Sequence, residues 1–224
     1  MIKLQETSPF AHGNHRAVYR HPSNPARCLK FMTEDFKENN RWKKSSWLSK
    51  LVRPRRYYQD NDAELHFSKQ VKKRIGNEIS TFIAEAHGYV DSDLGSILEV
   101  DLIRDHDGEI SLSLKEYLYR KGMTPECQIA LDSFWDQLEK NWIFVHGRPD
   151  NLSVSQAPDG SCQLYAIDGY AFGQFIPLAK WFRKDQKRLL NKRKRNQAKK
   201  IQHILNVKDN GGDITNNGFI TPPP

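Results

Sequence analysis

W-I-F-V-H-G-R-P-D-N-L-S-V, followed after a turn by L-Y-A-I-D-G-Y-A-F-G, is the stretch Trp142–Gly173 that decides the predicted fold. Its two apolar runs flank Ala157–Ser161, A-P-D-G-S, which has the composition of a turn. The pattern predicts a β-hairpin. Because the start of one antiparallel strand lies beside the end of the other, Asn151 and Asp168 are expected to be neighbours. An amide and a carboxylate placed together suit a hard cation such as Mg²⁺.

These residues carry a resemblance to known proteins. P-D-N before a hairpin and I-D-G after it resemble the catalytic and metal-binding loops of the protein-kinase-like superfamily. The opening I-K-L-Q-E-T-S-P-F, the run V-Y-R-H-P ahead of R-C-L-K, and I-P-L-A-K-W near the end resemble one branch, the YrbL-like family of PhoP regulatory network proteins. The resemblance covers roughly the first four-fifths of the chain, the size of one domain. It implies an α+β fold: a small N-terminal lobe with an antiparallel sheet, and a reduced helical C-terminal lobe.

The order of the expected elements divides the chain into three regions. Residues 1–105 form the N-terminal lobe, which carries a basic insertion at 35–60. Residues 106–205 form the reduced C-terminal lobe, with the catalytic-loop hairpin and a basic C-terminal helix, and the Asn-, Gly- and Pro-rich residues 206–224 are expected to be disordered. The insertion mixes basic and aromatic residues, which favours either a helix docked on the core or a surface for an acidic substrate, anionic membrane or nucleic acid.

The resemblance implies ATP and Mg²⁺ as cofactors and gives individual residues a role. Lys30 lies between apolar residues in an expected strand, so its charge requires an anion. The resemblance implies that Lys30 contacts the phosphates and that Glu64, on the next helix, is its partner; the alternative for Glu64 is a solvated helix face. Gly13 lies in a loop that either covers the phosphates or is an ordinary hairpin turn. Asn151 and Asp168 would be catalytic residues and hold the metal.

The catalytic loop differs from the kinase pattern. Aligned from Asn151, His146 takes the place of the usual catalytic Asp, and Arg148 takes the place of the usual Lys. Histidine can accept a proton near neutral pH, so His146 is a candidate base and Arg148 a candidate nucleotide contact. A gapped alternative matches His146-Gly147 to the His-Gly of small-molecule kinases, with Asp150 as the nearest carboxylate. Two functions stay open: phosphotransfer to a small-molecule, glycan or protein acceptor, and nucleotide-binding regulation or scaffolding by a catalytically impaired pseudokinase.

The basic charge of the chain is concentrated near its end. The 224 residues carry a net charge of +8, with a pI of about 9.3 and a mean hydropathy of −0.75. Pro177–His203 holds eleven Lys or Arg and one acid, a local charge of +10, so the rest of the chain sums to −2. Such a segment favours a phosphate-rich partner, either a nucleic acid or an anionic surface such as acidic lipid or lipopolysaccharide. The alternative is a solvated helix.

The sequence also predicts a cytoplasmic protein without a transmembrane segment. No apolar run approaches the ~20 residues needed to cross a bilayer. The first residues lack the apolar middle of a secretion signal. Cys28, Cys127 and Cys162 are far apart and odd in number, which fits neither a disulfide framework nor a zinc site.

Overall fold

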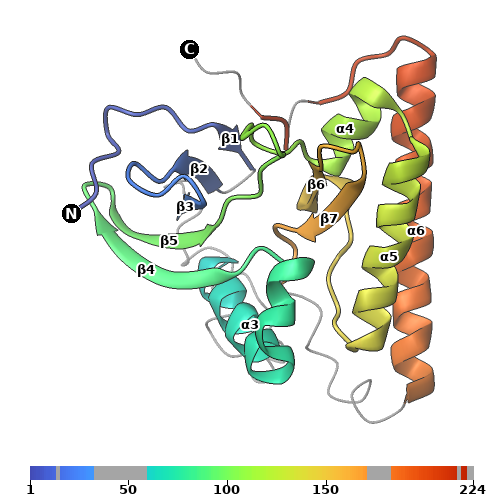
Figure 1. Cartoon of the computed structure of the whole chain (residues 1–224), viewed down its shortest axis with the longest axis horizontal. Coiled ribbons are helices and arrows are strands. Elements are labelled where there is room, and N and C mark those ends of the chain that lie inside the picture. The colour runs from blue at the N-terminus through green and yellow to red at the C-terminus, as the bar shows by residue number, and fades with distance from the viewer. Residues whose placement is uncertain (14–15, 33–59, 171–182, 216–217, 221–224) are drawn as a thin grey trace, which may run out of the picture.

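An antiparallel sheet of five strands forms the N-terminal part of the protein (Figure 1). The computed structural model describes residues 1–13, 16–32, 60–170, 183–215 and 218–220. The predicted insertion 35–60 therefore lies outside the described residues, apart from its last position. In spatial order the strands are β1 (Ala11–His12), β2 (Arg16–Arg20), β3 (Arg27–Met32), β5 (Gly95–Asp101) and β4 (Ala86–Ser92).

Strand β3 is the centre of the sheet and is buried on both faces. Cys28, Leu29 and Lys30 follow one another and are all buried. Leu29 packs against Leu4, which belongs to the N-terminal segment. Because successive side chains of a strand point to opposite faces, Lys30 shares the other face with Cys28. Helix α3 (Asp60–Ile75) covers that face of the sheet, and its residue Glu64 contacts Lys30.

Helix α3 joins the sheet to the rest of the protein. Leu65 packs against the sheet, whereas Phe67 and Val71 belong to the large hydrophobic core of the helical part. The ring of Phe67 stacks on Tyr170, with 4.6 Å between the ring centroids. The helix continues into η3 (Gly76–Thr81), which leads into β4. The position of the sheet relative to the helical part is therefore fixed by apolar packing.

The second part contains the predicted hairpin and three helices. Strands β6 (Leu152–Gln156) and β7 (Cys162–Ala166) pair in antiparallel register. Ser113 and Thr124 cap the two helices before the hairpin: their side chains accept hydrogen bonds from the N–H groups of Glu116 and Cys127. The elements are α4 (Leu114–Lys121), α5 (Pro125–Lys140), η4 (Pro149–Asn151) and α6 (Arg183–Asp209). The protein thus has a mixed α/β fold.

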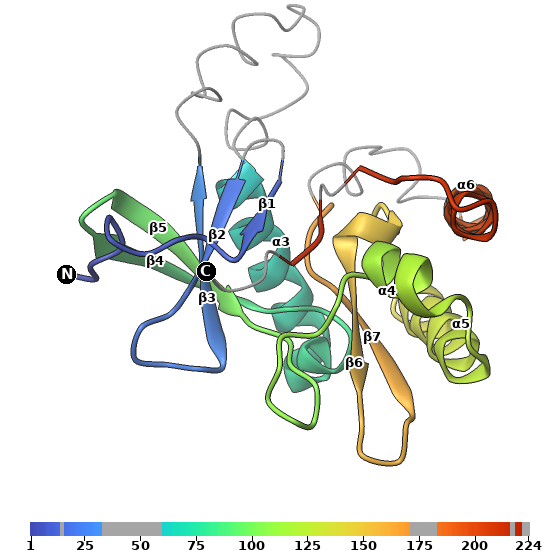
Figure 2. The same ribbon diagram turned by 90° about the horizontal axis from the view of Figure 1, so that it is seen from above.

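Helix α6 lies along α5 at the edge of the molecule farthest from the sheet (Figures 1 and 2). Its 27 residues span about 40 Å at 1.5 Å per residue. Leu190, Gln197, Ile201 and Ile204 recur at helical spacing and form its buried face. Residues 177–182 of the predicted basic segment lie outside the described residues. Within the described ranges no helix is both long enough and apolar enough to cross a membrane.

The C-terminal residues differ from the predicted disorder of 206–224. Helix α6 continues through Asp209, and the chain then turns back across the molecule. The backbone N–H of Ile220 donates to Glu116 Oε2 on α4 at 2.9 Å, and Ile220 also forms an antiparallel bridge with Ala11 of β1. This segment therefore links α4 to the sheet. Composition did not reveal it, because these contacts use backbone atoms.

Candidate functional site

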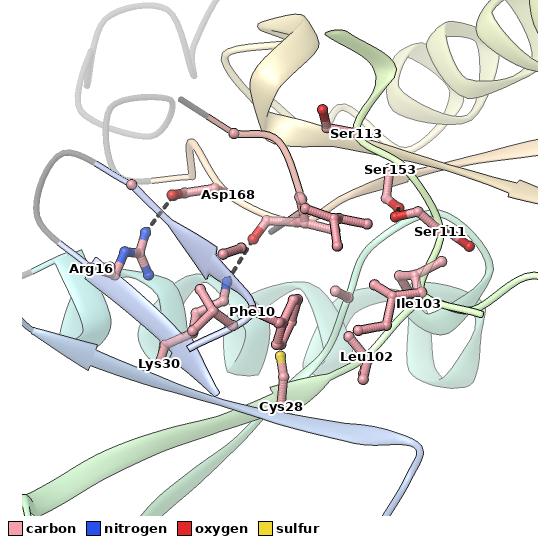
Figure 3. Close-up of a pocket in the computed structure, with 18 of the residues that line it drawn as sticks. Phe10, Arg16, Cys28, Lys30, Leu102, Ile103, Ser111, Ser113, Ser153 and Asp168 are labelled. Atoms are coloured by element: carbon pink, nitrogen blue, oxygen red, sulfur yellow. Dashed lines mark hydrogen bonds and ion pairs between the residues drawn. The ribbon is translucent and has the colours of Figure 1, made fainter. Parts of the chain in front are cut away.

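A cavity of about 140 Å³ lies between the sheet and the hairpin (Figure 3). A cavity of about this size can hold a single aromatic ring. Figure 3 shows Arg16, Lys30 and Asp168 on one side, and Leu102 and Ile103 on the other. The further lining residues include Phe10, Gly13, Val18, Ala84, Ile110, Ser111, Ser153, Ile167, Gly218 and Ile220. The cavity is mainly apolar, with Arg16, Lys30 and Asp168 at one end, and two further carboxylate residues, Asp101 and Asp150, are also part of its lining.

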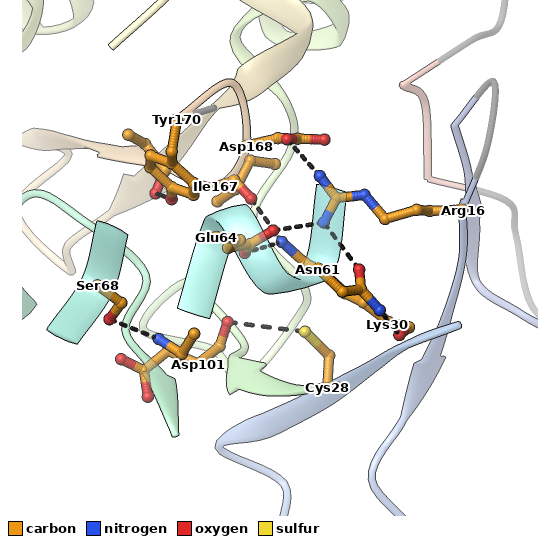
Figure 4. Close-up of polar contacts among 12 residues, drawn as sticks. Arg16, Cys28, Lys30, Asn61, Glu64, Ser68, Asp101, Ile167, Asp168 and Tyr170 are labelled. Carbon is orange, nitrogen blue, oxygen red and sulfur yellow. Dashed lines mark hydrogen bonds and ion pairs between the residues drawn. The ribbon is translucent and has the colours of Figure 1, made fainter. Parts of the chain in front are cut away.

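Lys30 and Glu64 form a buried ion pair at the charged end. Lys30 Nζ lies 2.5 Å from Glu64 Oε1 and also donates to the carbonyl oxygen of Ile167 at 2.6 Å (Figure 4). Lys30 is 6% exposed and Glu64 is 1% exposed. Asn61, one turn before Glu64, donates to the carbonyl oxygen of Lys30 at 2.9 Å. Helix α3 therefore holds both the backbone and the side chain of the lysine.

Arg16 is a third member of this cluster, and the sequence reasoning missed it. It is 7% exposed, and one of its amino groups, Nη1, donates to Glu64 Oε2. The same amino group contacts Asn61 Oδ1 at 3.3 Å. The other amino group, Nη2, donates to Asp168 Oδ1. Arg16 therefore links helix α3 directly to the residue that follows the hairpin.

A strand-register argument could have found Arg16. Val18 pairs directly with Lys30 across β2 and β3, and Arg16 pairs with Met32. Since side chains two residues apart share a face, Arg16 lies on the same face as Val18 and Lys30. A second cationic residue on the same sheet face as a buried lysine indicates that the two share a counter-ion.

Asp168 follows strand β7 at the charged end of the cavity. Its side chain is 44% exposed, so solvent and ligands can reach it. Burial of the site raises the pKa of this carboxyl group, but attraction by Arg16 and then by Lys30 outweighs burial and holds the pKa below its usual value. The N–H of Gly169 also donates to Asp168 Oδ1. Asp168 is therefore an anion at neutral pH, held by two donors.

Asn151 lies beside the turn that contains Asp168, as the hairpin geometry predicts, and His146 also lies beside this turn. The N–H of Ile167 donates to the carbonyl oxygen of Asn151 at 2.9 Å. The N–H of His146 donates to the carbonyl oxygen of Gly169 at 3.1 Å. A Cβ atom at Gly169 would overlap the side-chain amide of Asn151 and lie 3.2 Å from His146 Cβ. The absence of a side chain at Gly169 allows these residues to meet.

Alanine at Gly169 is expected to destabilise the protein more than alanine at Gly160. Both glycines have a φ of 83°, so both variants bear the strain of the left-handed region, about 1–2 kcal/mol. Only Gly169 has neighbours where the Cβ would lie, which adds about 1–3 kcal/mol of overpacking. Urea unfolding of the two variants measures the difference. Equal losses would show that the Asn151 contact is unimportant.

The pKa of His146 is below its usual value, chiefly because of burial and then because of the neighbouring Arg193 and Arg148. The unfolded chain therefore takes up a proton near pH 6.5 that the folded protein resists, and stability should fall as the pH drops below that value. His146→Asn is expected to reduce the loss of unfolding free energy between about pH 7.5 and about pH 5.5. The pKa of His87 is also lowered by burial, but His87 is present in both the wild type and His146→Asn and therefore does not affect the comparison. An equal loss of unfolding free energy in the wild type and in His146→Asn would contradict the lowered pKa of His146.

Arg148 and Gly13 lie close to the site, but their polar groups face other partners. Arg148 donates two hydrogen bonds to Asp150, from Nε at 2.9 Å and from an amino group at 2.6 Å. The N–H of Gly13 donates to the carbonyl oxygen of Arg16 at 2.8 Å, inside the β1–β2 turn. Gly13 lines the cavity, whereas Arg148 is absent from its described lining. These contacts favour a local structural role for Gly13 over a contact with phosphates. They likewise favour a pair with Asp150 over a nucleotide contact for Arg148.

The contacts of Asp168 also test the Mg²⁺ site expected from the sequence. Asp168 and Asn151 offer the oxygen atoms that Mg²⁺ prefers. However, Asp168 Oδ1 already accepts hydrogen bonds from the Arg16 guanidinium and from the N–H of Gly169, so both lone pairs of this oxygen are in use. In the described part of the chain, no group of three or more His, Cys, Asp or Glu side chains could hold a metal ion. The residues do not fit Mg²⁺ while Arg16 is paired with Asp168.

Comparison with known proteins assigns the chain to a family. A family model described as PhoP regulatory network protein YrbL matches residues 2–202. The "Uncharacterized protein YrbL" of Escherichia coli (strain K12) is 26% identical over 186 residues, which cover 81% of this chain and 79% of that protein. The protein of the same name from Shigella flexneri matches with the same values. Because the family model covers the sheet, the hairpin and most of α6, the chain belongs to the YrbL family of PhoP regulatory network proteins.

Proposed function

We propose that the chain is a kinase-like protein that binds ATP in the described cavity and transfers a phosphoryl group to a small-molecule, glycan or protein acceptor. One observation carries the proposal: Lys30, Glu64 and Asp168 come from three separate elements and meet at one end of an apolar cavity. An apolar cavity with a few charged groups at one end suits a ligand with a flat base and an anionic tail.

Lys30 would contact the phosphates. An ammonium group has three N–H donors, and the contacts with Glu64 and Ile167 use two of them. The third can donate to a phosphate oxygen while the ion pair is kept. Phosphoryl transfer depends mainly on such positioning and on charge neutralisation. The apolar lining, which includes Leu102 and Ile103, would hold the base.

His146 is the proposed proton acceptor. Because its pKa is lowered, by burial first and then by Arg193, the imidazole is neutral at neutral pH and can take a proton from an acceptor hydroxyl. Asn151, whose side-chain amide lies against Gly169, the residue after Asp168, would orient the phosphate end. The Mg²⁺ expected from the sequence stays a prediction, against which the Arg16–Asp168 pair weighs.

A turnover assay with Asp168→Ala tests the catalytic part of this proposal. ATP consumption with sugar and protein acceptors should fall on the order of 100-fold, the size of effect seen when one group that stabilises transition-state charge is removed. Asp159→Ala, in the exposed hairpin turn, is the matched control and should retain full activity. A lack of ATP consumption by the wild type with every acceptor would remove the enzyme proposal.

The second candidate is a catalytically impaired pseudokinase that binds nucleotide as a regulator or scaffold. Two features favour it: a histidine in place of the usual catalytic carboxylate, and the Arg16 contact on Asp168. Nucleotide binding without turnover is the result that it predicts. A binding titration with ATP, combined with the turnover assay, therefore separates the two candidates.

A third candidate is binding of a nucleic acid or anionic surface by α6. Arg188, Lys192, Arg195 and Lys199 are exposed and spaced by three or four residues, so they share one face of the helix. Replacing Lys192, Arg195 and Lys199 by Gln should lower the salt concentration that elutes the protein from heparin. The matched control replaces three exposed lysines elsewhere, Lys3, Lys69 and Lys73. Equal elution of both variants would exclude α6 as the contact surface.

A further inference from the structure

We propose that Arg16 takes the place of a divalent cation at Asp168, so that the cavity binds nucleotide phosphates without a metal. The inference rests on the nucleotide binding proposed above and names the cation that this site uses. It comes from the position of Arg16 between Glu64 and Asp168. No part of it depends on a catalytic role for His146.

Arg16 is held in this position by its surroundings. Its backbone is part of strand β2 and pairs with β3, and its side chain is more than nine-tenths buried. Glu64, Asn61 and Asp168 each accept a hydrogen bond from its guanidinium. A guanidinium is always charged in proteins, so it cannot give up its charge to make room for a metal ion. A metal on Asp168 Oδ1 would have to displace a buried, fixed cation.

The ion pairs of the cluster are already formed. Arg16 and Lys30 contribute two positive charges, Glu64 and Asp168 contribute two negative charges, and Asp60 adds a further negative charge near Arg16. A divalent cation added beside Arg16 would meet a like charge at short range. In a metal-dependent site the cation neutralises the carboxylate and the phosphates together. Here Arg16 already neutralises Asp168, the more exposed of the two carboxylates.

Arg16 also has donors to offer a phosphate group. A guanidinium carries five N–H donors, and the contacts of Arg16 within the described residues use three of them. Arg16, Lys30 and Asp168 all line the same cavity. A phosphate oxygen at this end can therefore accept charge-assisted hydrogen bonds from both cations. The ligand class is a nucleotide bound as a free anion rather than as its magnesium complex.

Calorimetric titration of the wild type with ATP, once in EDTA and once in excess Mg²⁺, tests the inference. ATP should bind at least as tightly in EDTA as in excess Mg²⁺, because the free anion is the ligand and Mg²⁺ removes it by forming the magnesium complex. Arg16→Gln should weaken binding in EDTA by about tenfold or more, the loss of a hydrogen bond between charged groups. Arg20→Gln, an exposed arginine at the end of the same strand, is the matched control and should bind as the wild type does.

The outcomes separate this inference from the proposed function. Wild-type binding that is at least about tenfold weaker in EDTA overturns the inference but supports nucleotide binding. A lack of saturable ATP binding in both buffers overturns both. A titration with Mn²⁺ alone, monitored by electron paramagnetic resonance, tests the inference in the absence of nucleotide. The wild type should show no saturable site, and a site that is lost in Asp168→Asn would overturn the inference. The wild-type experiments hold even if Arg16→Gln does not fold.

Discussion

Replacing Glu64 by alanine is expected to lower the free energy of unfolding by about 3–5 kcal/mol, the cost of removing one partner of a buried ion pair. The two oxygens of Glu64 face different buried cations, Oε1 facing Lys30 and Oε2 facing Arg16. Alanine would leave both cations buried, with Asp168 as the remaining carboxylate of the cluster. The guanidinium cannot deprotonate to relieve the charge, so the variant bears the full penalty.

Urea unfolding measures this loss. Glu78→Ala, an exposed glutamate in η3, is the control and should change stability by no more than about 0.5 kcal/mol. Adding Lys30→Met to Glu64→Ala should recover part of the lost stability, because it removes one of the two buried cations that Glu64→Ala leaves. The effects of substitutions within one charge network are not additive. A loss below about 1 kcal/mol in Glu64→Ala would mean that the cluster is not a stabilising network.

Replacing Trp135 by alanine is expected to have an effect of similar size at the other end of the molecule. Trp135 is 3% exposed and packs edge-on against Phe134, with 6.0 Å between the ring centroids. Its indole N–H donates to Gln197 Oε1 at 2.6 Å, which ties α5 to α6. Loss of the ring costs about 3–5 kcal/mol, and the buried amide of Gln197 loses its donor. The ring also packs against the backbone of Gly147, directly after His146.

Ile129→Ala is the control on the same helix. Ile129 is 69% exposed on α5, so its truncation should change stability by no more than about 0.5 kcal/mol. Thermal unfolding, monitored by the circular dichroism of the helices, measures the stability of both variants. If Trp135→Ala and Ile129→Ala melted together, the packing of α6 on α5 would make no measurable contribution to stability.

Local chemistry made the hairpin and the helix caps predictable. The sequence A-P-D-G-S requires a turn, and Gly160 within it adopts a φ of 83°. Thr124 followed by Pro125 marks a helix start, and the structure caps α5 with Thr124. In each case a few adjacent residues determine the outcome. Strands β2 and β3 were also predicted, because two short apolar runs lie on either side of the turn residues His21–Pro25.

Contacts between distant residues were harder to predict. Arg16 and Asp168 are separated by 152 positions, and no motif in the sequence joins them. The segment that reaches Ile220 binds Glu116 through a backbone N–H, which leaves no side-chain signal in the sequence, so its Asn-, Gly- and Pro-rich composition suggested disorder. The Lys30–Glu64 pair was found because the family resemblance supplied its partner. Only register reasoning within the sheet could have added Arg16.

The central claim is that the charged end of the cavity binds the phosphates of ATP. Equilibrium dialysis of ATP against the wild type and Lys30→Met tests it most directly, with Lys69→Met, an exposed lysine of α3, as the control. We predict saturable binding to the wild type and to the control, weakened by about tenfold or more in Lys30→Met. Absence of saturable binding to the wild type, or equal binding by Lys30→Met, would contradict the claim.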